Sequence, residues 1–214
     1  MALRIGDTAP DFEQLSTHGL LRFHDWKRGA WAVFFAHPQN FTPVCTTEIG
    51  EAARLAPEFA ARGAKLIGLS VDDLVHHQAW LADIEAVGGH RPQFPLIADE
   101  DRSVSHLYDM LNPSAAVTRT VRNLFLIDPS NRVRLILTYP NAVGRNFREI
   151  LRTLDALRMT DAHPVVTPVD WQPGDEVIVD PALTDPALLR AKFPGGLRSE
   201  LSYLRRAAQP SEAL

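Results

Sequence analysis

The stretch WAVFFAHPQNFTPVC, residues 31–45, decides the fold. Its beginning, Trp31–Ala36, is a continuous apolar run without polar alternation, which is typical of a strand buried on both faces of a sheet. After the turn-rich HPQNFTP, apolar residues recur at spacings of four and three from Ile49 to Ala60, which predicts a helix that ends at Gly63. A buried strand therefore leads through a short turn into a helix.

The rest of the chain continues this alternation as far as residue 161. We expect further strands at 65–71, 94–98, 121–127 and 133–139, and further helices at 73–87, 101–110 and 146–158. Alternating strands and helices, followed by a hairpin and a closing helix, predict an α/β fold with a mixed central sheet flanked by helices. From residue 162 prolines crowd the sequence. We therefore expect one domain over 1–161 and a small C-terminal domain or arm over 162–214, of the kind that commonly packs on a partner subunit.

The composition argues against several classes of protein. The formal net charge of −4 and the lack of a long basic run argue against binding to nucleic acid or to an anionic membrane. No apolar run approaches the roughly 20 residues of a membrane-spanning helix, and the N-terminus lacks the apolar core of a signal peptide. We therefore expect a soluble, cytoplasmic protein. A single cysteine forms no internal disulfide and supplies no cysteine-rich zinc site, so we expect no metal site.

That single cysteine, Cys45, lies where a reactive sulfur is expected. A free cysteine is usually a small buried apolar residue. Here, however, Thr42 fits the N-cap of the predicted helix and Pro43 fits its first position, which puts Cys45 in the first turn. The unpaired backbone N–H groups and the positive end of the helix dipole favour the thiolate, which is the reactive form of cysteine.

The residues around Cys45 match a longer motif. Residues 38–45 read PQNFTPVC and match Pro-x-x-x-Thr-x-x-Cys, the signature of the peroxiredoxins. The longer stretch 37–48, the sequence GRNF at 144–147, TPVDW at 167–171 and YLR at 203–205 resemble the one-cysteine branch of that family. The resemblance covers essentially the whole chain. It implies a thioredoxin-like fold, antioxidant peroxidase activity on hydrogen peroxide and organic hydroperoxides, and no cofactor.

The resemblance also implies roles for the residues that match. Cys45 attacks the terminal oxygen of the peroxide, and donors placed around the leaving oxygen lower the barrier. The Thr42 hydroxyl lies one helical turn before the sulfur and can both donate to the peroxide and accept from it, although Thr42 can also be only the helix cap. Arg122 interrupts an apolar strand, and its guanidinium is expected to hold the thiolate. Arg119 and Arg145 compete for that role, and we expect Arg145 to assist Arg122.

Three further residues complete the predicted site. Pro38 is expected to close the pocket over the sulfur and to keep water out. His37 orients the pocket or joins a proton relay, unless it is a purely structural histidine. Glu48 is expected to pair with an arginine such as Arg122 rather than to act as a base, because a second negative charge disfavours a thiolate. Asn40 stands where this branch often carries aspartate, which removes a charge from the loop.

The lack of a second cysteine predicts the second half of the cycle. The Cys45 sulfenic acid has no internal thiol to condense with, so an external thiol such as thioredoxin or glutathione is expected to reduce it. The arm suggests a homodimer, and this family also builds rings of dimers.

Two other functions remain open. One is a redox-responsive oligomeric holdase with Cys45 as a peroxide sensor, and the other is a thioredoxin-fold binding module with an inert cysteine.

Overall fold

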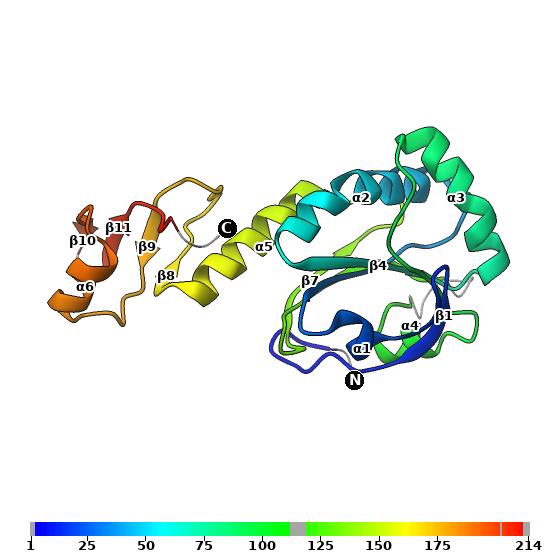
Figure 1. Ribbon diagram of the computed structural model, residues 1–214, viewed down its shortest axis with the longest axis horizontal. Coiled ribbons are helices and arrows are strands. Elements are labelled where there is room, and N and C mark those ends of the chain that lie inside the picture. The colour runs from blue at the N-terminus through cyan, green and yellow to red at the C-terminus, as the bar shows by residue number, and fades with distance from the viewer. Residues whose placement is uncertain (1–2, 112–118, 202, 212–214) are drawn as a thin grey trace. The chain divides into compact units, whose positions relative to one another are not determined.

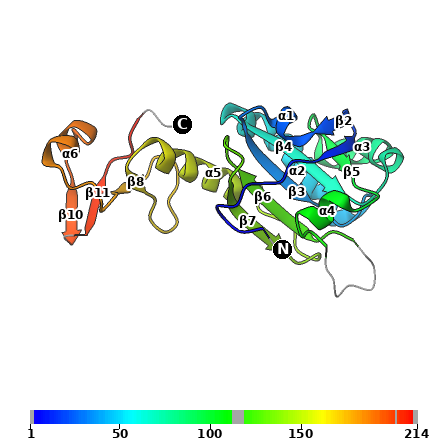
Figure 2. The same cartoon turned by 90° about the horizontal axis from the view of Figure 1, so that it is seen from below.

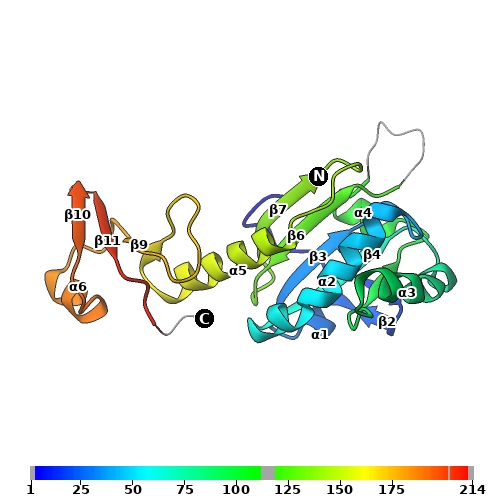
Figure 3. The same cartoon turned by 90° about the horizontal axis from the view of Figure 1, so that it is seen from above.

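A computed structural model describes residues 3–111, 119–201 and 203–211. The chain divides into two compact units, residues 1–147 and 148–214, which Figures 1, 2 and 3 show from three sides. The domain boundary expected after residue 161 stays a prediction. None of the helices in the described ranges is long and apolar enough to cross a membrane.

The first unit is built on a seven-stranded sheet with the strand order β2-β1-β5-β4-β3-β6-β7. Strands β3, β4 and β5 are parallel, whereas the pairs β1–β2, β1–β5, β3–β6 and β6–β7 are antiparallel. The strands are β1 (Glu13–Ser16), β2 (Gly19–Arg22), β3 (Trp31–Ala36), β4 (Ala64–Ser70), β5 (Leu96–Ala98), β6 (Arg122–Ile127) and β7 (Val133–Tyr139). The mixed central sheet predicted from the sequence is therefore confirmed.

Helices cover both faces of this sheet. Helices α2 (Pro43–Ala61) and α3 (Leu74–Gly88) lie on one face, and α1 (Phe23–Lys27) and α4 (Ser103–Leu107) lie on the other (Figures 1 and 3). Strands β3 and β6 are buried along their whole length because each has a strand on both sides and helices above and below. The apolar run Trp31–Ala36 is this doubly buried strand, as its sequence predicts.

Two glycines bring α2 and α3 into close contact. A β-carbon added at Gly88 would lie 2.8 Å from the Cα atom of Gly50, which is closer than packed atoms come. The helix ends there, and Gly89 adopts a left-handed conformation with φ of +69°. A glycine at position 88 therefore allows the end of α3 to pack directly against Gly50 of α2.

The second unit has its own small core. It contains nearly all of α5 (Phe147–Ala162), together with β8 (Val165–Val166), β9 (Val177–Val179), α6 (Pro186–Lys192), β10 (Arg198–Leu201) and β11 (Leu204–Ala207). The four strands form a sheet in the order β10-β11-β9-β8. Trp171 is 1% exposed and packs with apolar residues of α5, β9 and β11, so the proline-rich segment is an ordered module.

Candidate active site

The sulfur-bearing turn lies at the start of α2, directly after β3. Thr42 is the N-cap residue with extended backbone angles (φ −117°, ψ 145°), Pro43 is the first helical residue, and Cys45 follows in the first turn. The thiol of Cys45 is fully buried. The sequence placed these three residues correctly.

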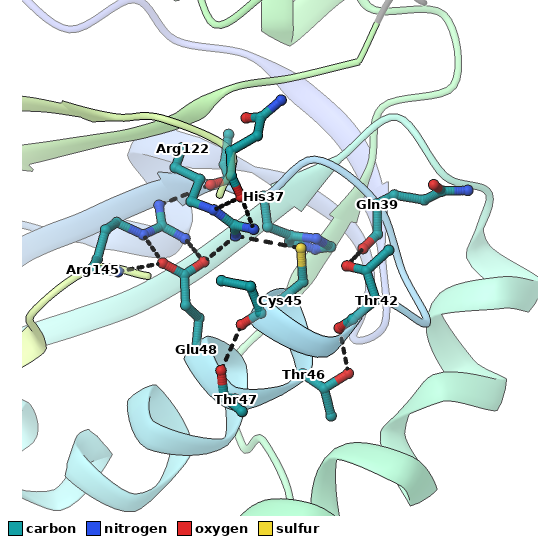
Figure 4. Close-up of polar contacts among 12 residues, drawn as sticks. His37, Gln39, Thr42, Cys45, Thr46, Thr47, Glu48, Arg122 and Arg145 are labelled. Atoms are coloured by element: carbon teal, nitrogen blue, oxygen red, sulfur yellow. Dashed lines mark hydrogen bonds and ion pairs between the residues drawn. The ribbon is translucent and has the colours of Figure 1, made fainter. Parts of the chain in front are cut away.

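The Thr42 hydroxyl does not cap the helix. It makes no capping bond to the helix backbone and instead donates to the carbonyl oxygen of Gln39 over 2.9 Å (Figure 4). The interpretation of Thr42 as only a cap is therefore wrong, because the loop 39–42 draws the hydroxyl away from the helix N–H groups. The hydroxyl oxygen keeps its capacity to accept a hydrogen bond.

Arg122 reaches the sulfur from the first position of β6. Its Nη1 atom lies 3.4 Å from the Sγ atom of Cys45 and 2.5 Å from Oε2 of Glu48 (Figure 4). Its Nε and Nη2 atoms both donate to the carbonyl oxygen of Asn141, over 3.1 and 2.8 Å. The residue is only 2% exposed. These bonds hold a permanent positive charge against the sulfur, and such a charge favours a thiolate.

Glu48 lies one turn after Cys45 and joins a second arginine to the first. Arg145 donates to Oε1 of Glu48 from its backbone N and Nε atoms, over 2.7 and 2.9 Å, and to Oε2 from Nη2, over 2.9 Å. Its Nη1 atom donates to the carbonyl oxygens of Ala36 and Asn123. Burial lowers the pKa of Arg145 below its ordinary value, and the charge of Glu48 opposes that shift.

These charges do not balance without the sulfur. Two buried guanidinium groups, of Arg122 and Arg145, share the single carboxylate of Glu48, which leaves one positive charge uncompensated. An uncompensated buried charge is costly, and a negative charge beside it removes the cost. The Cys45 sulfur lies in contact with Arg122 and could carry such a charge. The cluster is electrically neutral when Cys45 is ionised.

His37 lies behind the sulfur-bearing turn and is fully buried. Its carbonyl oxygen accepts from Thr120 over 2.6 Å, but neither ring nitrogen has a hydrogen-bond partner among the described residues. The ring packs 5.2 Å from Trp80 and 5.9 Å from His77 between centroids. Burial, followed by the charges of nearby groups, lowers the pKa of His37 well below its ordinary value, so the ring is neutral.

The structure brings together most of the residues that the sequence singled out. Cys45, Glu48, Arg122 and Arg145 form one hydrogen-bonded cluster. Pro38 is buried in the adjoining loop, and its role over the sulfur stays a prediction. Arg119 is exposed, unlike the two buried arginines. The sequence missed the carbonyl of Asn141, because a backbone acceptor carries no residue signature.

The chain is similar to known proteins along its length. The model of the AhpC/TSA family matches residues 5–136, and that of the C-terminal domain of 1-Cys peroxiredoxin matches residues 156–192. A relative from Dictyostelium discoideum, named 1-Cys peroxiredoxin, is 44% identical over 210 residues, which make up 98% of this chain and 87% of the relative.

Two solved structures are similar to this fold. A mutant of the Peroxiredoxin 6 of Arenicola marina has a TM-score of 0.92 and 38% identity, and the match covers 99% of this chain and 100% of the other. A yeast mitochondrial 1-Cys peroxiredoxin has a TM-score of 0.89 and 45% identity, with 96% of this chain and 99% of the other covered. The description of that yeast structure concerns thiol resolution through the glutathione and thioredoxin systems.

Proposed function

The chain belongs to the AhpC/TSA family and to its one-cysteine peroxiredoxins, which are thiol peroxidases, and from this premise we propose that Cys45 is the residue that reduces the peroxide. The observation that carries this assignment is the contact of 3.4 Å between Nη1 of Arg122 and Sγ of Cys45. It places a buried cation against a sulfur in the first turn of a helix, and both features favour the thiolate.

The chemical step forms one S–O bond and breaks the O–O bond. The Cys45 thiolate attacks the terminal oxygen of the peroxide, the sulfur is oxidised to sulfenic acid, and the other oxygen leaves as an alkoxide or hydroxide that takes a proton. In our proposal the Thr42 hydroxyl accepts the hydrogen bond of the attacked O–H group. Arg122 stabilises the negative charge before and during the attack. Arg145 positions Arg122 through their shared partner, Glu48.

Pro38 and His37 have supporting roles in the proposal. Pro38 is buried beside the sulfur-bearing turn and limits access of water to the sulfur. His37 is a neutral ring that packs against Trp80 and His77 and directly precedes the same loop in the chain. A neutral ring adds no positive charge that would compete with Arg122 for the thiolate.

Substitution of Cys45 by serine tests the assignment. Cys45→Ser keeps the size of the side chain but removes the thiolate, so hydrogen peroxide consumption with dithiothreitol should fall to the background rate. Thr47→Ser is the matched control, because Thr47 is an exposed neighbour on the same helix. Mass spectrometry of wild-type protein after one equivalent of peroxide should find one added oxygen on Cys45. Wild-type turnover by Cys45→Ser would overturn the proposal.

The reductant comes from outside the chain. With a single cysteine, the sulfenic acid cannot form an internal disulfide, so a thiol reductant is the second partner of the reaction. We propose thioredoxin, glutathione or a comparable thiol for this role, as the yeast relative uses the glutathione and thioredoxin systems. A panel of these reductants, with the rate of peroxide loss as the readout, separates them.

The proposal extends to assembly and location. We propose a homodimer, with a ring of dimers as the higher form, because C-terminal arms of this kind commonly pack on a partner. Sedimentation of the protein at several concentrations tests this.

We propose a cytoplasmic location, although the yeast relative is mitochondrial. The relatives from Dictyostelium discoideum, Arenicola marina and yeast are named peroxiredoxins, which favours the peroxidase over the holdase.

A further inference from the structure

A hollow of about 570 Å³ lies beside the start of α2. It is lined by the loop 39–42, by residues 71–73, by His76 of α3 and by Glu100. No lysine or arginine is among its lining residues in the described part of the chain. Thr42 lines this hollow and also stands one helical turn before Cys45. A small molecule bound here therefore lies against Thr42, one helical turn before the residue that carries the reacting sulfur, and the volume suits one.

The hollow carries negative charge that the protein does not neutralise. Asp73 pairs with His76 over 2.6 Å between Oδ2 and Nδ1, and this bond together with the backbone N–H of His76 lowers the pKa of Asp73. Asp72 accepts bonds from Asn40 N and Ser70 Oγ through Oδ2 alone. Among the described residues, no bond reaches Oδ1 of Asp72, and Glu100 makes no ion pair.

Two neighbouring side chains indicate what the hollow binds. Asn40 is 3% exposed and lines the hollow, yet its Oδ1 and Nδ2 atoms have no hydrogen-bond partner in the described part of the chain. Burying an amide in this way is costly unless a ligand or water satisfies it. Phe41 lies at the rim with 49% of its surface exposed, and its backbone is left-handed, with φ of +55°. An exposed aromatic face attracts cations.

On the premise of the proposed function, we infer that this hollow binds the cationic group of the small thiol that reduces Cys45 sulfenic acid. The carboxylates of Asp72 and Glu100 attract an ammonium group, Oδ1 of Asn40 accepts a hydrogen bond from it, and the ring of Phe41 covers it. No group of three or more His, Cys, Asp or Glu side chains in the described ranges is arranged to hold a metal ion.

The reaction that this binding assists uses two thiols. The first attacks the Cys45 sulfur, an S–S bond forms, the S–O bond breaks, and the oxygen leaves as water with both protons. A second thiol attacks the mixed disulfide, releases Cys45 as a thiol and leaves as the oxidised disulfide. The two thiols together supply the two electrons that the peroxide removed. Binding of the first thiol in the hollow raises its local concentration beside the sulfenic acid.

Thiols that differ in charge test the inference. Wild-type protein oxidised with one equivalent of hydrogen peroxide is mixed with cysteamine, which is cationic, or with 3-mercaptopropionate, which is anionic. The rate of loss of Cys45 sulfenic acid is then followed by quenching and mass spectrometry. The ratio of the two rate constants is compared between wild type and the double variant Asp72→Asn, Glu100→Gln. Because the intrinsic reactivity of each thiol cancels in this comparison, the ratio should fall about three- to tenfold in the variant.

A matched control removes two negative charges elsewhere. Asp25 on α1 is exposed on the other face of the sheet, and Glu58 lies roughly 24 Å along α2 from Thr42. The double variant Asp25→Asn, Glu58→Gln should keep the wild-type ratio. An equal fall in this control would show that overall charge and not the hollow selects the thiol, and would overturn the inference.

Salt gives a test that needs no variant. When sodium chloride is raised from 20 mM to 500 mM, the ratio of the two rate constants in wild type should fall by about threefold or more, toward that of the Asp72→Asn, Glu100→Gln protein. The reason is that salt screens exposed charges. A ratio that stays constant with salt overturns the inference even if the variant fails to fold. Failure of the proposed function is distinct, because wild-type Cys45 would then gain no oxygen from peroxide before any thiol is added.

Discussion

The Nη1 atom of Arg122 donates to the sulfur of Cys45 over 3.4 Å and to the carboxylate of Glu48 at the same time. One nitrogen therefore serves two acceptors that lie a single helical turn apart on α2. The Glu48 carboxylate fixes the guanidinium of Arg122. Because Arg145 shares the same carboxylate, the two arginines carry one more positive charge than Glu48 balances. The sulfur therefore faces an oriented cation, and the single carboxylate of the cluster does not cancel the positive charge of both arginines.

Arg122→Met should slow the reaction of Cys45 with peroxide and move it to higher pH. A hydrogen bond to a charged group contributes about 1.5–3 kcal/mol, so the rate constant at neutral pH should fall about 10- to 100-fold. The pH of half-maximal rate should rise, because the thiolate loses the cation that favours it. Stopped-flow measurement of Cys45 oxidation between pH 5 and pH 9 gives both values.

Arg119→Met is the control for this experiment, since Arg119 is exposed and lies three residues earlier in the chain. It should keep the wild-type rate and pH profile. Arg122→Lys retains a charge but not the fork of donors, and should recover part of the rate. A wild-type pH profile in Arg122→Met would contradict the role proposed for Arg122.

Glu48→Gln should destabilise the protein strongly. It leaves two buried guanidinium groups without their shared carboxylate, and breaking a buried ion pair in this way costs about 3–5 kcal/mol. Urea unfolding followed by far-UV circular dichroism measures the loss. Glu51→Gln removes a carboxylate of the same helix that pairs with Arg54 at the surface, and should cost no more than about 1 kcal/mol. Equal losses in the two variants would show that the buried cluster has no special stabilising role.

Much of the sulfur-bearing turn could be predicted from local sequence. Proline at the first helical position, threonine before it and an apolar run on each side are signals that depend only on neighbouring residues, and the start of α2 follows them. Arg122 was singled out by the resemblance and because a charged residue that interrupts an apolar strand run is rarely a plain surface charge, and the structure places it at the start of β6.

The partners of these residues could not be predicted in the same way. The bond from Thr42 to the carbonyl of Gln39 depends on how the loop folds back, and helix-capping rules favour a different bond. The carbonyl of Asn141 meets Arg122 across 19 positions of sequence, and backbone carbonyls are the same in every residue. Asn40 and Asp72 meet because β3 and β4 are neighbours, which only the sheet order shows.

Acid should destabilise the protein through two buried histidines. Burial lowers the pKa of His77 to about 4, and it also lowers that of His37 well below its ordinary value. In the unfolded chain the histidines take up protons near pH 6.5, whereas in the folded chain His77 does so only near pH 4. The contribution of a neutral His77 to the free energy of unfolding is therefore fully present above about pH 6.5 and is lost as the pH falls toward 4. His77 alone should contribute a loss of about 2 kcal/mol between pH 7 and pH 5.

His77→Gln should remove that contribution from the pH dependence. The free energy of unfolding, measured with urea at pH 7 and at pH 5, should differ by about 2 kcal/mol less than in wild type. His76→Gln changes the exposed neighbour and should leave most of the difference in place. If the two variants showed the same pH dependence as wild type, burial of a neutral His77 would not be the cause of acid lability.

Thr42→Val should separate catalysis from stability. Valine has the shape of threonine without the hydroxyl, and because that hydroxyl does not cap α2, the loss in stability is limited to one hydrogen bond, about 1 kcal/mol. The rate constant for oxidation of Cys45 by peroxide should nevertheless fall about 100-fold, since the transition state loses a placed hydroxyl. Thr42→Ser keeps the hydroxyl and should keep most of the rate. A Thr42→Val protein that reacts as fast as Thr42→Ser would mean that the hydroxyl serves the loop, through Gln39, and not the peroxide.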